Sequence, residues 1–308
     1  MSSLRQALED YLRLRRSLGY KLTQQGKLLS DFVAYVERLG SPFLTTAAAL
    51  DFATQPVNAI RSTWAGRLSV VRHFAQYVRA LDSRTEVPPP KLLPFRKRRL
   101  TPYLYSEADV RALMRAAQAL RAPAFSRLMS TTLIGTLATT GMRVGEAIGL
   151  DRSDFDKREG ILSIREGKFG KSREVPLHPS TREALRAYEK ERNRTLPRPR
   201  SSAFFLSRVG TRLHRQNVSM TFSRVRRHAG LEDRKPRRPR IHDLRHTFAV
   251  QTLLAWYRAG ADVEAQLPRL STYLGHVNPS TTYWYLTATP ELVALAARRL
   301  DHDLGEPR

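Results

Sequence analysis

The stretch Ile241-His-Asp-Leu-Arg-His-Thr-Phe-Ala249 decides how the rest of the chain is interpreted. On a helix, His242 and Arg245 stand three residues apart and lie on one face. Both donate hydrogen bonds, and the arginine keeps a planar positive fork at any relevant pH. Such a pair suits an oxyanion, and a phosphate diester in particular. The stretch therefore predicts a helix that binds a phosphate.

A third histidine and two tyrosines follow this stretch. His276 ends the motif Leu-Gly-His, and the motif Thr-Tyr-Trp-Tyr then supplies Tyr283 and Tyr285. A tyrosine hydroxyl can attack phosphorus and form a covalent ester. The region downstream of the phosphate-binding helix therefore contains two candidate nucleophiles.

The composition indicates the kind of partner. A chain of 308 residues favours two domains, and its hydrophobic fraction of 41% is enough for real cores. The net charge of +25 and the pI near 11.1 exceed what solubility requires. The basic residues lie along both halves of the chain, which fits an extended polyanion such as double-stranded DNA better than a merely solvated surface.

Cysteine is absent, which excludes disulfides, thiolate zinc sites and a thiol nucleophile. No apolar run reaches membrane-spanning length, and the N-terminus carries no signal-peptide pattern. We therefore expect a cytoplasmic, nucleoid-associated protein.

The first part of the chain has a helical pattern followed by a break. Apolar residues recur at helical spacing over residues 4–81, with stops at Gly19 and Gly40. Such a pattern is typical of a helical bundle, and the charge favours one that places its arginines on phosphates. Prolines then interrupt the periodicity, and a basic cluster that would cross a DNA backbone follows at Arg96, Lys97, Arg98 and Arg99.

Two further motifs lie upstream of the phosphate-binding helix. Arg143 follows a Gly-containing break and precedes an apolar helix, and Glu146 is placed to orient it. Residues 160–176 change to an alternating pattern around a basic, Gly-flanked turn, which predicts a β-hairpin. Lys168 lies in that turn, and we expect the neighbouring Lys171 and Arg173 to contact DNA.

In these motifs the chain resembles the tyrosine recombinases of the phage-integrase family, over nearly its whole length. The family pattern has a Gly-x-Arg-x-x-Glu box, a lysine in a hairpin turn, His-x-x-Arg-His, Leu-Gly-His, and a tyrosine nine residues further on. Each box alone is weak evidence, whereas all five in the right order are highly specific. The family's functional residues correspond here to Arg143, Lys168, His242, Arg245, His276 and Tyr285.

The resemblance implies a two-domain DNA clamp of mainly α (α+β) class, with a small β-sheet in the catalytic domain. Its parts would be a helical, SAM-like core-DNA-binding domain (residues 1–86), a basic Pro-rich linker (87–101) and a catalytic domain (102–308). It further implies a site-specific recombinase that acts on double-stranded DNA as a homotetramer on paired sites. Other recombinases of the same element are candidate partners.

Phosphodiester chemistry gives the cationic residues and the tyrosine distinct roles. Arg143 and Arg245 would neutralise the two non-bridging oxygens and hold them more strongly in the transition state. Tyr285 would attack phosphorus, and Lys168 would protonate the departing 5′ oxygen. Because the resulting phosphotyrosine ester keeps the bond energy, we expect no cofactor.

The histidines have two possible uses. His242 and His276 would add hydrogen-bond donors to the same phosphate oxygens. A metal site is disfavoured, because the motif is not His-Glu-x-x-His and Arg245 would repel a cation. We interpret His246 as a buried structural histidine.

The chain departs from the family pattern between His246 and His276. This segment is several residues longer than in the compact chromosome-resolving members, with residues 255–260 in the extra length. It resembles integrases and transposases of mobile elements, so we expect a role in integration, excision or transposition. Type IB topoisomerase-like relaxation and a non-catalytic DNA-binding regulator of the same fold are the alternatives.

The chain ends in a predicted amphipathic helix over residues 291–300. Its apolar stripe consists of Leu292, Leu295, Ala296 and Leu300. An apolar face must be buried somewhere. It packs either on its own domain or, as the resemblance implies, on a neighbouring protomer in a ring.

Overall fold

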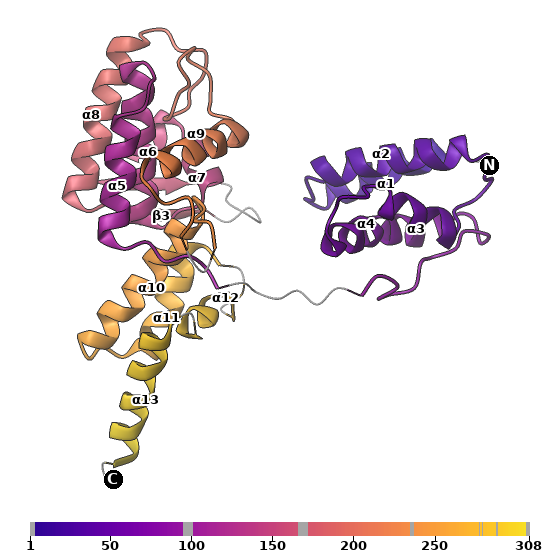
Figure 1. The fold of residues 1–308 in the computed structure, drawn as a ribbon. Helices are drawn as coiled ribbons and strands as arrows, with labels where there is room; N and C mark the ends of the chain where they lie inside the picture. The colour runs from indigo at the N-terminus through magenta and orange to yellow at the C-terminus, as the bar shows by residue number, and fades with distance from the viewer. Residues whose placement is uncertain are drawn as a thin grey trace. The chain divides into compact units, whose positions relative to one another are not determined.

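The computed structural model describes residues 4–94, 101–165, 172–234, 237–276, 278, 280–287 and 289–305. The chain forms two compact units, Met1–Arg99 and Leu100–Arg308 (Figure 1). The basic cluster at Arg96, Lys97, Arg98 and Arg99, and the hairpin lysines Lys168 and Lys171, lie outside the described residues.

The N-terminal unit is a bundle of helices, as the periodicity predicted. Its apolar core includes packed aromatic rings: the ring of Tyr11 lies 5.5 Å from that of Phe74, and Phe32 lies 5.1 Å from Phe52. Thr45 caps the third helix by accepting a hydrogen bond from the Ala48 amide at 3.1 Å. The helices are α1 (Leu4–Ser17), α2 (Thr23–Arg38), α3 (Thr46–Thr54) and α4 (Arg61–Arg79).

The larger unit begins with a helical layer around an apolar central helix. That helix, α6 (Ala124–Thr140), buries Leu133, Ile134 and Leu137 among its neighbours. Ser106 and Asp109 form a capping box at the start of α5. The other helices of this layer are α5 (Glu107–Gln118), α7 (Val144–Gly149), α8 (Pro179–Thr195) and α9 (Arg215–His228).

A small antiparallel sheet follows α7 and the 3-10 helix η1 (Arg152–Asp154), with strand order β1-β2-β3. In the pairing of β2 with β3, Leu162 lies opposite Val175 and Ile164 opposite Arg173. The mainly helical fold with a small sheet is therefore confirmed. The strands are β1 (Phe155–Asp156), β2 (Ile161–Ile164) and β3 (Arg173–Pro176).

The last third of the chain has its own apolar cluster, which includes Val250, Leu254 and Leu270. Tyr285 and Leu292 belong to this cluster, so the segment after α11 packs back on α10. The elements are α10 (Asp243–Arg258), α11 (Val263–Leu274), α12 (Ser280–Tyr283), the 3-10 helix η3 (Trp284–Thr287) and α13 (Pro290–Gly305).

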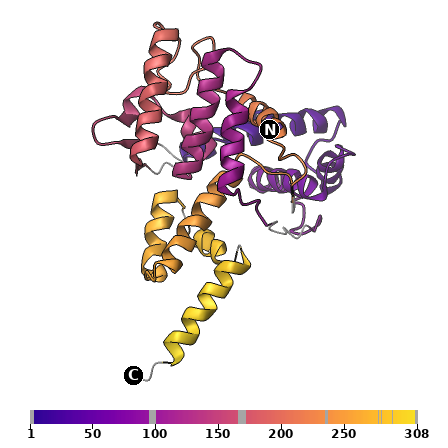
Figure 2. The ribbon, with the colours of Figure 1, turned by 60° about the vertical axis from the view of Figure 1, so that its left-hand side comes forward.

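The final helix is held at its beginning. Thr289 accepts a hydrogen bond from the Leu292 amide at 3.1 Å, and Leu292 is fully buried. Leu295 packs against the same cluster, whereas Val293 is half exposed. Both views show the rest of α13 running away from α10 and α11 (Figures 1 and 2). Among the described residues, we find no helix with the length and apolar character needed to cross a membrane.

Candidate active site

Arg245 is the most deeply buried cation of the phosphate-binding helix. Its side chain leaves the first turn of α10 and is 2% exposed. The guanidinium donates to the carbonyl oxygens of Gly141 at 2.9 Å and Leu274 at 2.6 Å. Burial, followed by the nearby charge of Arg143, lowers its pKa to about 10, so it stays cationic at neutral pH.

Arg143 lies at the start of α7 and points toward the same turn. Its Nη2 donates to the carbonyl of Gly275 at 3.0 Å, one residue beyond the carbonyl that Arg245 contacts. Its Nη1 donates to Glu146 at 2.6 Å, which bears out the orienting contact expected of that carboxylate. The turn at residues 274–275 therefore brings together two arginines that are far apart in sequence.

Glu146 organises this cluster of charges. Its carboxylate also accepts hydrogen bonds from the Arg143 amide at 2.8 Å and from Arg173 at 3.1 and 2.8 Å. Burial opposes its ionisation, but the bonds from Arg173 and Arg143 outweigh that effect and lower its pKa to about 2. At neutral pH the charged carboxylate of Glu146 thus holds Arg143 and Arg173 in place.

Arg173 lies where we did not expect it. Instead of projecting toward DNA, its guanidinium lies inside the protein, with a side chain that is 10% exposed. Its Nε donates to the Tyr273 carbonyl at 2.6 Å. The signal was present in the sequence: Arg173 shares a strand face with the buried Val175, because alternate residues of a strand point the same way.

Gly275 permits this close arrangement. It adopts a left-handed conformation with φ of 67° and ends α11. A Cβ at this position would lie 2.7 Å from Nη1 of Arg173, a distance that would displace the guanidinium. The backbone conformation therefore favours glycine in the Leu-Gly-His motif, and any side chain there would have to shift the guanidinium of Arg173.

The two predicted phosphate-binding histidines lie around the arginines and are held neutral. Burial and then the charge of Arg245 lower the pKa of His242 to about 4, and the same causes lower that of His276 to about 3. Nδ1 of His276 lies 2.7 Å from the hydroxyl of Thr282, which leaves Nε2 for another partner. Each neutral imidazole still has one N–H group to donate.

The two tyrosines differ sharply in environment. Tyr285 is 2% exposed and its ring stacks 6.1 Å from that of His276, whereas Tyr283 is 52% exposed. The hydroxyl of Tyr285 lies 3.1 Å from Nδ1 of His246. An ionised Tyr285 would raise the pKa of Arg245, so the two groups lie close enough to interact electrostatically. Tyr285 thus stands within the arginine and histidine cluster.

His246 therefore contacts the Tyr285 hydroxyl in addition to packing in the interior. Sequence reasoning treated it as structural and missed its contact with Tyr285, although its position one helical turn after His242 placed it on the same face. The two imidazole rings meet edge to face at 5.0 Å. Across the described ranges, no three His, Cys, Asp or Glu side chains converge in a way that could hold a metal ion.

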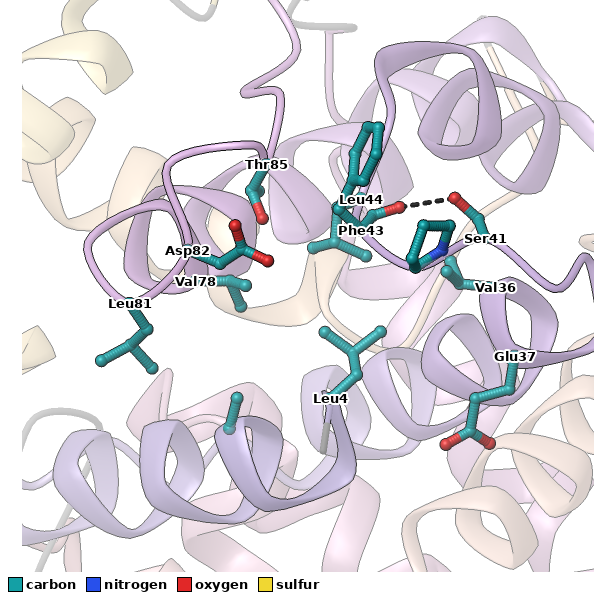
Figure 3. Close-up of a pocket in the computed structure, with 12 residues that line it drawn as sticks. Leu4, Val36, Glu37, Ser41, Phe43, Leu44, Val78, Leu81, Asp82 and Thr85 are labelled. Carbon is teal, nitrogen blue, oxygen red and sulfur yellow. Dashed lines mark hydrogen bonds between the residues drawn. The ribbon is translucent and has the colours of Figure 1, made fainter. Parts of the chain in front are cut away.

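A cavity of about 380 Å³ lies within the N-terminal unit, and none of the candidate-site residues lines it (Figure 3). Leu4, Phe43 and Leu81 contribute carbon surface to it. Its carboxylates are already neutralised, Glu37 by Arg5 and Asp82 by Arg84. The cavity offers no free cation to a phosphate and is not part of the site.

The buried Arg245, the partly exposed Arg143 and the enclosed tyrosine form an arrangement suited to phosphodiester chemistry. The family model described as "Phage integrase family" matches residues 104–291, which contain all of these side chains. The chain belongs to the phage integrase family, and it is a tyrosine-type site-specific DNA recombinase.

Relatives match along the whole chain. A Sinorhizobium fredii protein (strain NGR234) named as an integrase/recombinase, y4rB, is 45% identical over 98% of both chains. A second from the same organism, y4rE, is 42% identical over 98% of this chain and 97% of the other. Tyrosine recombinase XerC of Roseiflexus sp. (strain RS-1) is 30% identical over 73% of this chain and 67% of its own length.

Solved structures share the fold. The integrase of the Tn1549 transposon, in complex with transposon right end DNA, has a TM-score of 0.65 at 16% identity, covering 97% of this chain and all of that one. The XerH site-specific recombinase in a post-cleavage complex has a TM-score of 0.64 at 20% identity, covering 88% of this chain and 77% of its own.

Proposed function

We propose that this recombinase cleaves and rejoins DNA through a 3′-phosphotyrosine at Tyr285, in the integration, excision or transposition of a mobile element. The observation that carries the assignment is the burial of the Tyr285 hydroxyl within the cluster of Arg245, His246 and His276. The names of the Sinorhizobium relatives and the fold shared with a transposon integrase support the mobile-element role.

Arg143 and Arg245 hold the scissile phosphate. Both guanidinium groups are anchored on the carbonyls of one turn, so they reach the substrate already oriented. Their charges match the two non-bridging oxygens and become more effective as charge grows in the transition state. His242 and His276 donate further hydrogen bonds from their neutral imidazoles.

The strand exchange itself is a balanced transesterification. Oη of Tyr285 gives up its proton to a base and bonds to phosphorus, the P–O5′ bond breaks, and Lys168 delivers a proton to the departing oxygen. The free 5′ hydroxyl of a second strand then attacks the phosphotyrosine and releases the tyrosine. Lys168 lies outside the described residues, and its role rests on the family motif.

The test begins by sequencing the DNA junctions formed in cells that express the protein, which supplies the target duplex. A nicked version of that duplex should trap a covalent adduct on the wild type. Tyr285→Phe should abolish the adduct and leave gel-shift affinity nearly unchanged, because only a hydroxyl is lost. The matched control Tyr283→Phe should form the adduct normally.

The opposite pattern, with the adduct lost only in Tyr283→Phe, would assign the nucleophile to Tyr283. EDTA should leave the wild-type rate unchanged, and inhibition reversed by added zinc or magnesium would revive the metal site. Relaxation of supercoiled DNA without any need for paired sites would instead indicate topoisomerase-like activity.

We further propose a homotetramer on paired sites, acting on nucleoid DNA in the cytoplasm, alone or with other recombinases of the same element. A solved lambda integrase with the same fold forms a tetramer on a Holliday junction. Leu292 anchors the first turn of α13 in its own unit, while Val293 stays exposed. The later turns of α13 are therefore proposed to dock on the neighbouring protomer.

A short truncation tests the docking. Removing residues 297–308 keeps Leu292 and Leu295 in place, so the unit should fold and bind single sites. Synapsis of paired sites and recombination should be lost. Normal tetramers and normal recombination by the truncated protein would show that α13 is only local packing.

A further inference from the structure

His246 is the side chain placed against the nucleophile's oxygen. Its Nδ1 lies 3.1 Å from Oη of Tyr285, and the two rings lie 5.6 Å apart at 58°. Trp284 encloses the imidazole from η3, with its ring 5.6 Å away. The contact therefore lies between α10 and η3, where Tyr285 is buried and His246 is partly buried.

His246 is neutral in the free protein. Burial lowers its pKa to about 4, helped by the neighbouring His242. Asp243 also lies near His246 and raises its pKa. The other charged and titratable groups around it are Arg240, Arg245, Tyr285 and His276. A neutral imidazole has one lone pair, and with Nδ1 facing a phenol that lone pair can accept the hydroxyl proton.

We propose that His246 is the proton acceptor for Tyr285 during cleavage, an assignment that rests on the proposed function. As Oη bonds to phosphorus, its proton moves to Nδ1 of His246, and the P–O5′ bond breaks. The 5′ oxygen takes its proton from a separate acid. During rejoining the tyrosine leaves phosphorus and the imidazolium returns the proton to Oη.

The change in nearby charge when DNA binds explains how the weakly basic imidazole of His246 can accept the proton of Tyr285. In the free protein, a proton on His246 would add a positive charge beside His242 and Arg245. A bound phosphodiester places a negative charge on Arg143 and Arg245, and attack by tyrosine increases it. This charge favours the imidazolium, so His246 becomes a stronger base when the substrate is in place.

The experiment separates the proton transfer from Tyr285 from the protonation of the leaving group. The probe is the nicked target duplex with a bridging sulfur in place of the scissile 5′ oxygen, because a thiolate leaves without an acid. Adduct formation is measured from pH 5.5 to 9 for the wild type, His246→Gln and His242→Gln. Glutamine keeps a hydrogen-bonding side chain but cannot take up the proton.

The wild-type rate should reach a plateau near neutral pH. His246→Gln should be roughly 100-fold slower at pH 7, as expected for loss of a general base. Its rate should rise about tenfold per pH unit, because only the free phenolate, with a pKa of about 10, then attacks. His242→Gln, the matched control on the same helix face, should be slower but keep the plateau.

Three results would overturn the assignment. His246→Gln could keep the wild-type rate and plateau, the plateau could disappear in His242→Gln instead, or the wild type itself could rise without a plateau. If His246→Gln fails to bind DNA in a gel shift, His246→Asn replaces it under the same criteria. A wild type that forms no adduct on either nicked duplex would refute the proposed function itself.

Discussion

The two units bury very different side chains. Among the described residues of the N-terminal unit, the buried polar set contains Thr85, and the rest of the core is apolar. The C-terminal unit buries ionised groups as well, including Arg245 at 2% exposure and Asp243 at 0%. Buried charge is expensive unless it is paired, so its presence requires a dedicated set of partners.

The ion pairs follow the same division. Arg5 and Glu37 of the N-terminal unit pair at 2.7 Å, with side chains that are 71% and 35% exposed. Arg173 and Glu146 pair at 2.8 Å, with side chains that are 10% and 5% exposed. Water screens the attraction between Arg5 and Glu37. Arg173 and Glu146 lie in the protein interior, where the dielectric constant is lower and their electrostatic interaction is stronger.

Buried charge alone does not mark the active site. Arg192 is fully buried and donates to the Phe204 carbonyl at 3.0 Å, far along the chain from the catalytic motifs. Asp243 accepts hydrogen bonds from Arg237 and from the Arg240 amide, both at 2.8 Å, and so fixes the start of α10. The candidate active site differs in that its buried Arg245 interacts electrostatically with Tyr285 as well as with the carboxylate of Glu146.

The largest effect should come from removing one of the two arginines of the candidate site. Arg245→Ala and Arg143→Ala should each slow adduct formation by about 10³-fold or more, because a preorganised charge at the phosphate is lost. The measurement is single-turnover cleavage of the nicked duplex at saturating protein. The control Arg13→Ala changes an exposed arginine of α1 and should leave that rate unchanged. An equal loss of rate in Arg13→Ala would contradict the difference drawn between the two units.

A smaller effect is expected when the support of Arg143 is removed. Arg173→Ala should lower the cleavage rate by roughly 10²-fold, because Glu146 loses two hydrogen bonds and the Tyr273 carbonyl loses its donor. Arg173→Lys should recover only part of this, since an ammonium cannot form the bidentate contact.

The salt dependence of binding distinguishes this role from a DNA contact. A residue that only positions Glu146 should leave the slope of log affinity against log salt unchanged. A slope that becomes shallower by about 1 in Arg173→Ala, with a normal cleavage rate, would return Arg173 to the phosphate-contacting residues.

Acid should destabilise the C-terminal unit first. The folded pKa values of His242, His246 and His276 are depressed below the ordinary 6.5, so the unfolded chain binds more protons as pH falls below that value. Stability should therefore be lost between pH 6.5 and about 3, by a few kcal/mol at about 1.4 kcal/mol per pKa unit less a discount for partial exposure.

A second loss should follow as pH falls from 4.5 toward 2, where Glu146 takes up its proton. Peptide-resolved hydrogen exchange on the full chain measures both units at once. Parallel loss of protection in both units from pH 6.5 downward would contradict the assignment to the buried histidines.

The smallest effect belongs to the exposed pair of the N-terminal unit. Glu37→Gln removes the partner of Arg5 at the surface and should shift the melting temperature by no more than roughly 2 °C. A shift much larger than this would mean that the surface pair of α1 and α2 supports the bundle as strongly as buried pairs do.

The sequence by itself determined the helical character of the N-terminal unit, the small sheet and the order of the catalytic motifs. These features depend on local periodicity, on turn residues and on spacing along the chain. Arg143, Arg245 and Tyr285 could be chosen in this way because each lies in a short motif. The hairpin was predictable from its alternation, and Ile164 indeed pairs with Arg173.

Only the tertiary structure decided which side chains support these residues. His246 meets Tyr285 across 39 positions of sequence, and Arg173 meets Glu146 across 27. Such contacts depend on how α10, η3, β3 and α7 pack, and no local pattern specifies that packing. Burial then keeps the three histidines neutral. His246, interpreted from the sequence as structural, contacts Tyr285, and Arg173, expected on DNA, contacts Glu146 inside the protein.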